Sequence, residues 1–192
     1  MLVLLELVIG AAPARADWLV IPFAGTVFGG ETTSFLDLEQ AAGGAKGVIG
    51  VTGTWLTNQV IGVEGELMYG PSFFERGEIL ALKSYLATAS VGLLVTLPLA
   101  VTRESLRPDV VGGLGTMRAS ADYSVDLFDQ SQQFTTLHVG AGAIGFITPF
   151  TGVRFDVRHV NSLNRVSDEV TTAVGPRMRF WRASVGVVLR IG

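Results

Sequence analysis

Residues 60–70 read VIGVEGELMYG, and their side chains alternate between two kinds. The odd positions carry apolar residues and one glycine: Ile61, Val63, Gly65, Leu67 and Tyr69. The even positions include two carboxylates: Gly62, Glu64, Glu66 and Met68. Successive side chains of a β-strand point to opposite faces, so this period of two predicts a strand with one apolar and one charged face.

The same alternation recurs along the chain in segments of about ten residues. Residues 154–158 read RFDVR, with the charges on the even positions. From residue 180 onward the even positions again collect the polar side chains, including Arg182 and Arg190. The whole pattern predicts eight strands, over residues 18–28, 46–56, 60–70, 84–97, 108–119, 134–147, 152–160 and 178–191.

The connections between these strands alternate in length. Four are long: residues 29–45, 71–83, 120–133 and 161–177. The others are shorter: residues 57–59, 98–107 and 148–151. Transmembrane barrels have short periplasmic turns and longer external loops, and an even strand number places both termini in the periplasm. The sequence therefore predicts an all-β fold, an eight-stranded antiparallel up-and-down transmembrane β-barrel.

Alternation alone does not decide which face lies inside the barrel. A soluble barrel puts its apolar face inward, whereas a membrane barrel turns it toward lipid. Charged residues make up 16% of the chain, against roughly 25% in typical soluble domains. This charge is too small to coat an eight-stranded exterior, and the mean hydropathy is +0.46. Composition thus favours the membrane barrel, with a soluble periplasmic lipocalin-like barrel that binds lipid as the alternative.

Composition also excludes several classes of protein. The chain has no cysteine, which excludes a disulfide scaffold, and its net charge of −3 offers no basic footprint for nucleic acid.

Aromatic residues fall near the ends of the predicted strands: Trp18, Trp55, Tyr69, Tyr85, Phe146 and Phe150. Such positions predict girdles at the two membrane interfaces.

Residues 1–16 read MLVLLELVIGAAPARA, an apolar stretch that ends in Ala14-Arg15-Ala16. This small-residue pattern is one that a signal peptidase accepts, and the stretch is too short for a transmembrane helix. The sequence predicts a signal peptide over residues 1–16, cleaved before Asp17, and a single barrel domain over residues 17–192.

The charged strand faces predict a polar network inside the barrel. An eight-stranded barrel has a lumen just wide enough for side chains to fill, and unpaired buried charges would be costly there. We expect an ion-pair network with a structural role, made of Glu64, Glu66, Arg154, Asp156, Arg158 and Arg182.

Two glycine-rich strands complete the features on which a resemblance rests. They read VVGGLG over residues 110–115 and GAGA over residues 140–143, and RFDVR precedes the last long connection. With these features the chain resembles the small eight-stranded outer-membrane barrels of the OmpA transmembrane-domain, OmpX and opacity-protein type. Members of that group usually end in an aromatic residue, whereas this chain ends in Leu189-Arg190-Ile191-Gly192.

The resemblance implies a location and a set of partners. It implies an integral protein of the outer membrane of a diderm bacterium, with periplasmic termini, assembled by the barrel-assembly machinery and in contact with outer-membrane lipids and lipopolysaccharide. It also implies a structural or surface-interaction role through the external loops, without catalysis, with a narrow pore as an alternative. In the first long connection, Phe35, Leu36 and Leu38 form the best candidate patch for an extracellular partner.

Other motifs favour no cofactor or metal. Residues 140–145 match G-x-G-x-x-G, but strand and turn residues follow where a dinucleotide site needs a helix. His138 has no second ligand at metal spacing. The acidic residues of the third long connection lack the glycine and final glutamate of a helix-loop-helix calcium site: Asp122, Asp126 and Asp129.

His159 and Ser162 suggest an enzymatic function as a less favoured alternative. Some eight-stranded barrels are lipid A deacylases, similar to this chain in size, with a His-x-Ser motif and an acidic partner. Here the sequence reads His159-Val160-Asn161-Ser162, so the serine is one position too far and falls on the opposite strand face. Asp168 or Glu169 would supply the acid only through folding of the last long connection.

Overall fold

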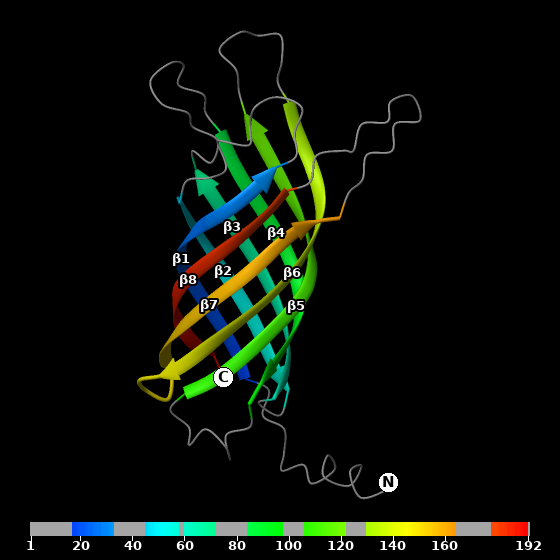
Figure 1. The fold of residues 1–192 in the computed structure, drawn as a ribbon. Coiled ribbons are helices and arrows are strands. Elements are labelled where there is room, and N and C mark those ends of the chain that lie inside the picture. Colours follow the sequence, from blue (N-terminus) through cyan, green and yellow to red (C-terminus); the bar gives the residue numbers. More distant parts are fainter. Residues whose placement is uncertain are drawn as a thin grey trace, which may run out of the picture.

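The computed structural model describes residues 17–32, 45–57, 60–71, 84–97, 106–121, 130–163 and 178–191. These residues form eight strands: β1 (Asp17–Thr32), β2 (Lys46–Thr57), β3 (Ile61–Pro71), β4 (Ser84–Thr96), β5 (Leu106–Ala121), β6 (Gln130–Phe146), β7 (Thr151–Ser162) and β8 (Met178–Ile191). Each strand pairs antiparallel with the next, and β8 pairs with β1, so the sheet closes into a barrel (Figure 1). The predicted fold class is confirmed.

In the described part of the chain, no helix is long and apolar enough to cross a membrane.

The predicted strand positions agree with the structure, but β1, β5, β6 and β7 are each at least three residues longer than predicted. The ladder between β5 and β6 continues to the pair formed by Ala121 and Gln130. Polar residues such as Ser120 and Gln132 have the composition of a loop, yet here they pair as strand. The hydrogen bonds of the ladder therefore extend β5 and β6 beyond the apolar part of their sequence.

One row of hydrogen-bonded neighbours shows how the barrel closes. The row starts at Trp18, passes through one residue of each following strand, and returns to β1 at Phe28: Trp18, Trp55, Val63, Leu93, Gly112, Val139, His159, Trp181 and Phe28. Phe28 is ten residues beyond Trp18, so the register shifts by ten residues around eight strands. This stagger corresponds to a strand tilt of about 40°, which places Phe28 about 25 Å above Trp18 along the barrel axis.

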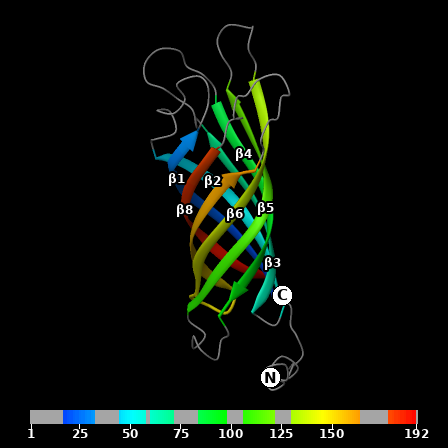
Figure 2. The same cartoon turned by 45° about the vertical axis from the view of Figure 1, so that its right-hand side comes forward.

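Both chain ends of the barrel lie at one end of the molecule. The start of β1 and the end of β8 are neighbours, because Trp18 pairs with Ile191 (Figure 2). The short connections after β2 and after β6 lie at this same end, since Asp17 pairs with Leu56 and Thr151 pairs with Leu189. We call this the turn end and the opposite end the loop end. Short turns lie in the periplasm in barrels of this kind.

The structure decides which face is inside. Along β3 exposed and buried residues alternate without exception. The apolar face points outward, since Leu93 is 64% exposed and Leu67 is 59% exposed, whereas the carboxylate Glu64 is only 2% exposed. Apolar residues outside and charged residues inside are the arrangement of a membrane barrel and the reverse of a soluble one.

Candidate functional site

The barrel interior is built in three layers. A first apolar cluster fills the loop end: Phe23, Val27, Val48, Met68, Leu86, Met117, Phe134, Met178 and Phe180. A second apolar cluster fills the turn end: Leu19, Ile21, Leu56, Leu94, Val111, Ile144 and Val188. Charged side chains lie between the two clusters, and we call them the ionic layer. Its members are Glu64, Glu66, Asp109, Arg154, Asp156, Arg158 and Arg182.

Arg154 on β7 joins two carboxylates from other strands. Its Nη1 lies 2.5 Å from Oε2 of Glu64 on β3. Its Nη2 lies 2.7 Å from Oδ1 of Asp109 on β5. All three side chains are almost fully buried, so these charge-assisted hydrogen bonds form away from bulk water. One guanidinium thus connects three strands that are not neighbours in the sheet.

Arg158 lies four positions beyond Arg154 along β7 and points to the same face. Its Nη2 lies 2.5 Å from Oε1 of Glu64, and its Nη1 lies 3.2 Å from Oε2 of Glu66. Its Nε donates to Oδ1 of Asp156 over 2.7 Å. Arg154 and Arg158 therefore share Glu64 from two directions.

Arg182 brings β8 into the ionic layer. Its Nη1 contacts Oε1 of Glu66, and its Nη2 lies 2.9 Å from Oε2 of the same carboxylate. The same Nη2 lies 2.9 Å from Oδ1 of Asp156. The guanidinium also packs over the ring of Phe23, 4.7 Å from its centre. Arg182 therefore links the ions to the apolar cluster at the loop end, where a cation–π contact offsets part of the cost of removing the charge from water.

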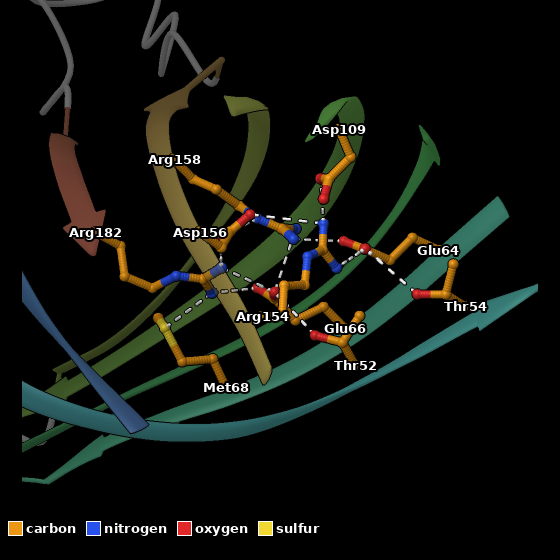
Figure 3. Close-up of polar contacts among 10 residues, drawn as sticks. All are labelled: Thr52, Thr54, Glu64, Glu66, Met68, Asp109, Arg154, Asp156, Arg158 and Arg182. Atoms are coloured by element: carbon orange, nitrogen blue, oxygen red, sulfur yellow. Dashed lines mark hydrogen bonds and ion pairs between the residues drawn. The ribbon is translucent and has the colours of Figure 1, made fainter. Parts of the chain in front are cut away.

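Two threonines of β2 complete the carboxylate environment. Thr52 Oγ1 donates to Oε2 of Glu66 over 3.4 Å, and Thr54 Oγ1 donates to Oε2 of Glu64 over 3.5 Å. Both are even-numbered residues, so their side chains face the lumen beside β3. Figure 3 shows these groups converging from opposite walls of the barrel.

The structure brings together the six residues predicted for the network, and it adds Asp109. The alternation in β5 could have found Asp109, because it shares the inward face with Arg107. In the sequence analysis only the glycines of that strand were considered, in VVGGLG over residues 110–115. The cations of the layer all come from β7 and β8, whereas three of the four carboxylates come from β3 and β5.

The interior leaves little free space. Two cavities that border the ionic layer have volumes of about 10 and 20 Å³. A cavity of about this size holds roughly one water molecule. Neither is large enough to admit a substrate or a hydrated ion. The arrangement is thus suited to bracing opposite walls of the barrel rather than to binding a ligand inside it.

His138 lies in the larger cavity and packs on a glycine pair. A Cβ at Gly113 would lie 2.8 Å from Cε1 of His138, and a Cβ at Gly92 would lie 3.2 Å from its Nε2. Gly92 and Gly113 are register partners on β4 and β5, so their missing side chains make room for the imidazole. These two glycines on the inner faces of β4 and β5 thus leave space for a neighbouring side chain. In the described segments, no group of three or more His, Cys, Asp or Glu side chains is arranged to hold a metal ion.

His159 and Ser162 do not form a catalytic pair. His159 points outward and contacts the ring of Trp181 in a tilted arrangement, with ring centres 4.8 Å apart and an interplanar angle of 58°. Ser162 is buried on the inner face of β7, where its Oγ accepts a hydrogen bond of 2.9 Å from the backbone N–H of Met178. The opposite faces follow from their spacing of three along a strand. Asp168 and Glu169 lie outside the described residues.

Other predicted residues also lie outside the described part of the chain. They are the loop patch Phe35, Leu36 and Leu38, the acidic residues Asp122, Asp126 and Asp129, and the signal peptide over residues 1–16. Their assignments stay predictions.

Aromatic residues cluster at both ends of the outer face. Trp18 and Trp55 lie near the turn end with ring centres 6.5 Å apart. Tyr69 and Tyr85 stack at 6.0 Å near the loop end. These pairs lie where interfacial girdles are expected.

The girdle prediction was wrong for Phe146. This side chain has even parity on β6 and turns inward, where it packs against the apolar cluster of the turn end. Arg107 and Arg190 lie over its ring at 5.0 and 4.3 Å from the centre. Two cation–π contacts therefore hold the ring inside, although its position in the sequence is at a strand end.

Comparison with known proteins identifies a matching family and several similar structures. The chain matches the family described as outer membrane protein beta-barrel domain over residues 2–189. Neisserial surface protein A (NspA) has a similar structure, with a TM-score of 0.64 at 14% identity, over 94% of this chain and 100% of that one. The N-terminal barrel of OprF from Pseudomonas aeruginosa gives 0.59 at 16% identity, over 93% and 99% of the two chains.

A third similar structure is Ail, the attachment invasion locus protein of Yersinia pestis, in complex with the heparin analogue sucrose octasulfate. It gives a TM-score of 0.54 at 13% identity, over 91% of this chain and 99% of that one. No curated protein sequence matches the chain. At these identities the three structures share the fold alone.

A closed barrel with an apolar outer band and a charged, filled interior defines the class of small eight-stranded outer-membrane β-barrels. The family match covers nearly the whole chain, so the protein belongs to the outer membrane protein β-barrel domain family. It is an outer-membrane protein of a diderm bacterium, and the predicted resemblance to small barrels of this type is confirmed.

Proposed function

We propose that this protein is a sealed outer-membrane anchor that acts through its external surface, in a structural or surface-interaction role without catalysis. One observation carries the proposal: the ionic layer is enclosed between two apolar clusters that fill the barrel at its two ends. A sealed lumen leaves the loop end as the surface on which a partner can bind.

The ionic layer supports a structural role for the interior. Its three arginines and four carboxylates come from β3, β5, β7 and β8, so the ion pairs span the lumen rather than lie along one wall. Removing one member would leave a charge buried without its partner, at a cost of about 3–5 kcal/mol. Such a layer resists both separation of the walls and entry of solutes.

The external role rests on the predicted loop patch of Phe35, Leu36 and Leu38. Apolar residues in an external loop mark a surface for contact with a partner. In this proposal the signal peptide over residues 1–16 directs export, the barrel-assembly machinery inserts the mature chain, and the loops meet an extracellular partner. The lateral surface of the barrel contacts outer-membrane lipids and lipopolysaccharide.

Conductance in planar bilayers tests the seal. Purified protein reconstituted into a planar phosphatidylcholine bilayer is expected to give no stepwise current in molar KCl. A large porin inserted in the same bilayer serves as the positive control. Reproducible current steps that follow the folded protein would replace the anchor proposal with the narrow-pore alternative.

Loop substitution tests the surface role separately. The triple variant Phe35→Ser, Leu36→Ser and Leu38→Ser is expected to reach the outer membrane at the normal level but to lose adhesion of the producing cells to a host-cell or matrix surface. A matched variant with Leu93→Ala, on the lipid-facing wall, should keep that adhesion. Unchanged adhesion of the triple variant would remove this patch from the proposal.

A further inference from the structure

The larger of the two interior cavities lies where the ionic layer meets two strands that contribute no member to it. Its volume is about 20 Å³, and three members of the ionic layer border it: Glu66, Arg158 and Arg182. Hydroxyl side chains of β4 and β6 also border it: Thr88, Ser90 and Thr136. The cavity is therefore lined by groups that can donate and accept hydrogen bonds.

The strand register brings these polar groups into one row across the inner wall. Glu66 on β3 pairs with Ser90 on β4, and Ser90 pairs with Gly115 on β5. Gly115 in turn pairs with Thr136 on β6. All four positions face inward, and Gly115 has no side chain to fill the space between the two hydroxyls. Ser90 is only half-buried although it faces the lumen, so interior space reaches its side chain.

Arg158 supplies a donor that the described protein groups do not use. The residue is only 2% exposed, and its Nε and Nη2 are engaged with Asp156 and Glu64. Its Nη1 lies 3.2 Å from Oε2 of Glu66, but it makes no hydrogen bond with any described group. A buried donor without an acceptor is costly, so an acceptor inside the cavity would stabilise the barrel.

Size and charge together select the occupant of the cavity. A volume of about 20 Å³ holds roughly one water molecule. An anion there would be repelled by the carboxylate of Glu66, and a cation would be repelled by the guanidiniums of Arg158 and Arg182. The site therefore suits one small neutral molecule that both donates and accepts hydrogen bonds.

We propose that this cavity binds a single long-lived water molecule as a fixed part of the barrel interior. The water accepts a hydrogen bond from Nη1 of Arg158 and donates to the hydroxyl oxygens of Ser90 and Thr136. It thereby ties β4 and β6 to the ionic layer, to which these strands contribute no charge. This proposal goes beyond the sealed-anchor function, because a barrel can be sealed with or without an internal water, so either can fail alone.

The methionines of the barrel make the test selective. Met68 borders the cavity, whereas Met117 and Met178 belong to the same apolar cluster but do not border it. The protein is labelled with ¹³C in its methionine methyl groups, otherwise deuterated, and reconstituted into phosphatidylcholine nanodiscs. NMR then measures nuclear Overhauser effects from water to each methyl group. Wild type is expected to give a cross-peak at Met68, with the sign of a slowly exchanging water, and none at Met117 or Met178.

Two variants remove one hydroxyl each from the proposed site. Ser90→Val also fills part of the cavity, whereas Thr136→Val keeps the shape of the side chain. Each is expected to weaken the Met68 cross-peak at least about fivefold. The control is Thr54→Val, which removes an inward hydroxyl of β2 that does not border this cavity and should leave the cross-peak unchanged.

Heat-modified migration on SDS gels verifies that each variant is folded. No cross-peak at Met68 in wild type would overturn the proposal, as would an unchanged cross-peak in both folded variants. A cross-peak lost in only one variant would also overturn it, since that result indicates proton exchange of a single hydroxyl rather than a water held between the two. Loss in both variants and retention in Thr54→Val is the result that supports the site.

Discussion

Glu64 and Arg154 connect opposite walls of the barrel. Glu64 lies on β3 and Arg154 on β7, which is four strands away in either direction around the closed ring of eight. Arg154 Nη1 lies 2.5 Å from Glu64 Oε2, and both side chains are almost fully buried. A direct ion pair across the lumen means that the diameter of the barrel at this level is set by side chains as well as by strand number.

Replacing Glu64 with glutamine should destabilise the barrel strongly. The change keeps the shape but removes the charge that Arg154 and Arg158 share. We expect the free energy of unfolding to fall by about 3–5 kcal/mol, because two buried guanidiniums lose a partner. Urea unfolding in phospholipid vesicles, followed by tryptophan fluorescence, measures the change. Val139→Ala, on the exposed outer face of β6, is the control and should change it by less than about 0.5 kcal/mol.

The pair formed by Glu66 and Arg182 should show strong coupling. Either Glu66→Gln or Arg182→Met alone leaves an opposite charge buried, whereas the double variant removes both charges. A double-mutant cycle is expected to give a coupling energy of about 1–3 kcal/mol, with the double variant more stable than the sum of the single changes predicts. Arg182 also contacts Asp156 over 2.9 Å, and the double variant removes that contact, which limits the recovery. Simple additivity would show that the two groups do not act as a pair.

Two glycines on opposite faces should respond differently to alanine. A Cβ at Gly113 would lie 2.5 Å from the Cα of Gly92 and 2.8 Å from Cε1 of His138. Gly113→Ala is therefore expected to cost about 1–3 kcal/mol through overpacking. Gly53 faces outward, where a Cβ would meet nothing within 4 Å, so Gly53→Ala should be neutral or slightly stabilising. Equal effects in urea unfolding would contradict this account of the inner glycines.

Trp181 should report the outer boundary of the membrane. A variant with Trp18→Phe and Trp55→Phe leaves Trp181 as the remaining tryptophan, since the chain has three. Its position about 22 Å above Trp18 places the indole near the headgroups. Lipids brominated close to the headgroup should quench its fluorescence more than lipids brominated at the chain ends. The reverse order would mean that the barrel sits at a different depth than the apolar band indicates.

Much of this architecture could be predicted from alternation. The carboxylates of VIGVEGELMYG and the charges of RFDVR have the same parity as the lumen-facing residues, and low total charge assigned the apolar face to lipid. Alternation assigns a face but not a partner. It could not show that Arg154 contacts Asp109 on β5, because that contact depends on barrel diameter and stagger.

The errors have local causes. Phe146 stands at a strand end, as a girdle residue would, but its even parity turns it toward Arg107 and Arg190. The ends of β5 and β6 have polar sequences that resemble loops, and only the ladder between Ala121 and Gln130 identifies them as strand. The parity of Phe146 is present in the sequence of β6, where even positions face inward. The extra length of β5 and β6 depends on pairing between strands, which a single strand's composition does not contain.

The origin of the buried charges has a consequence for biogenesis. Glu66 and Arg182 are 116 positions apart, and every guanidinium that neutralises the carboxylates of β3 belongs to the last two strands. A chain that lacks its C-terminal hairpin keeps these carboxylates without their partners, and charged groups of this kind stay in water rather than enter hydrocarbon. The carboxylates of β3 are therefore neutralised only when the last two strands are in place, so the complete barrel is the form in which these charges suit a bilayer.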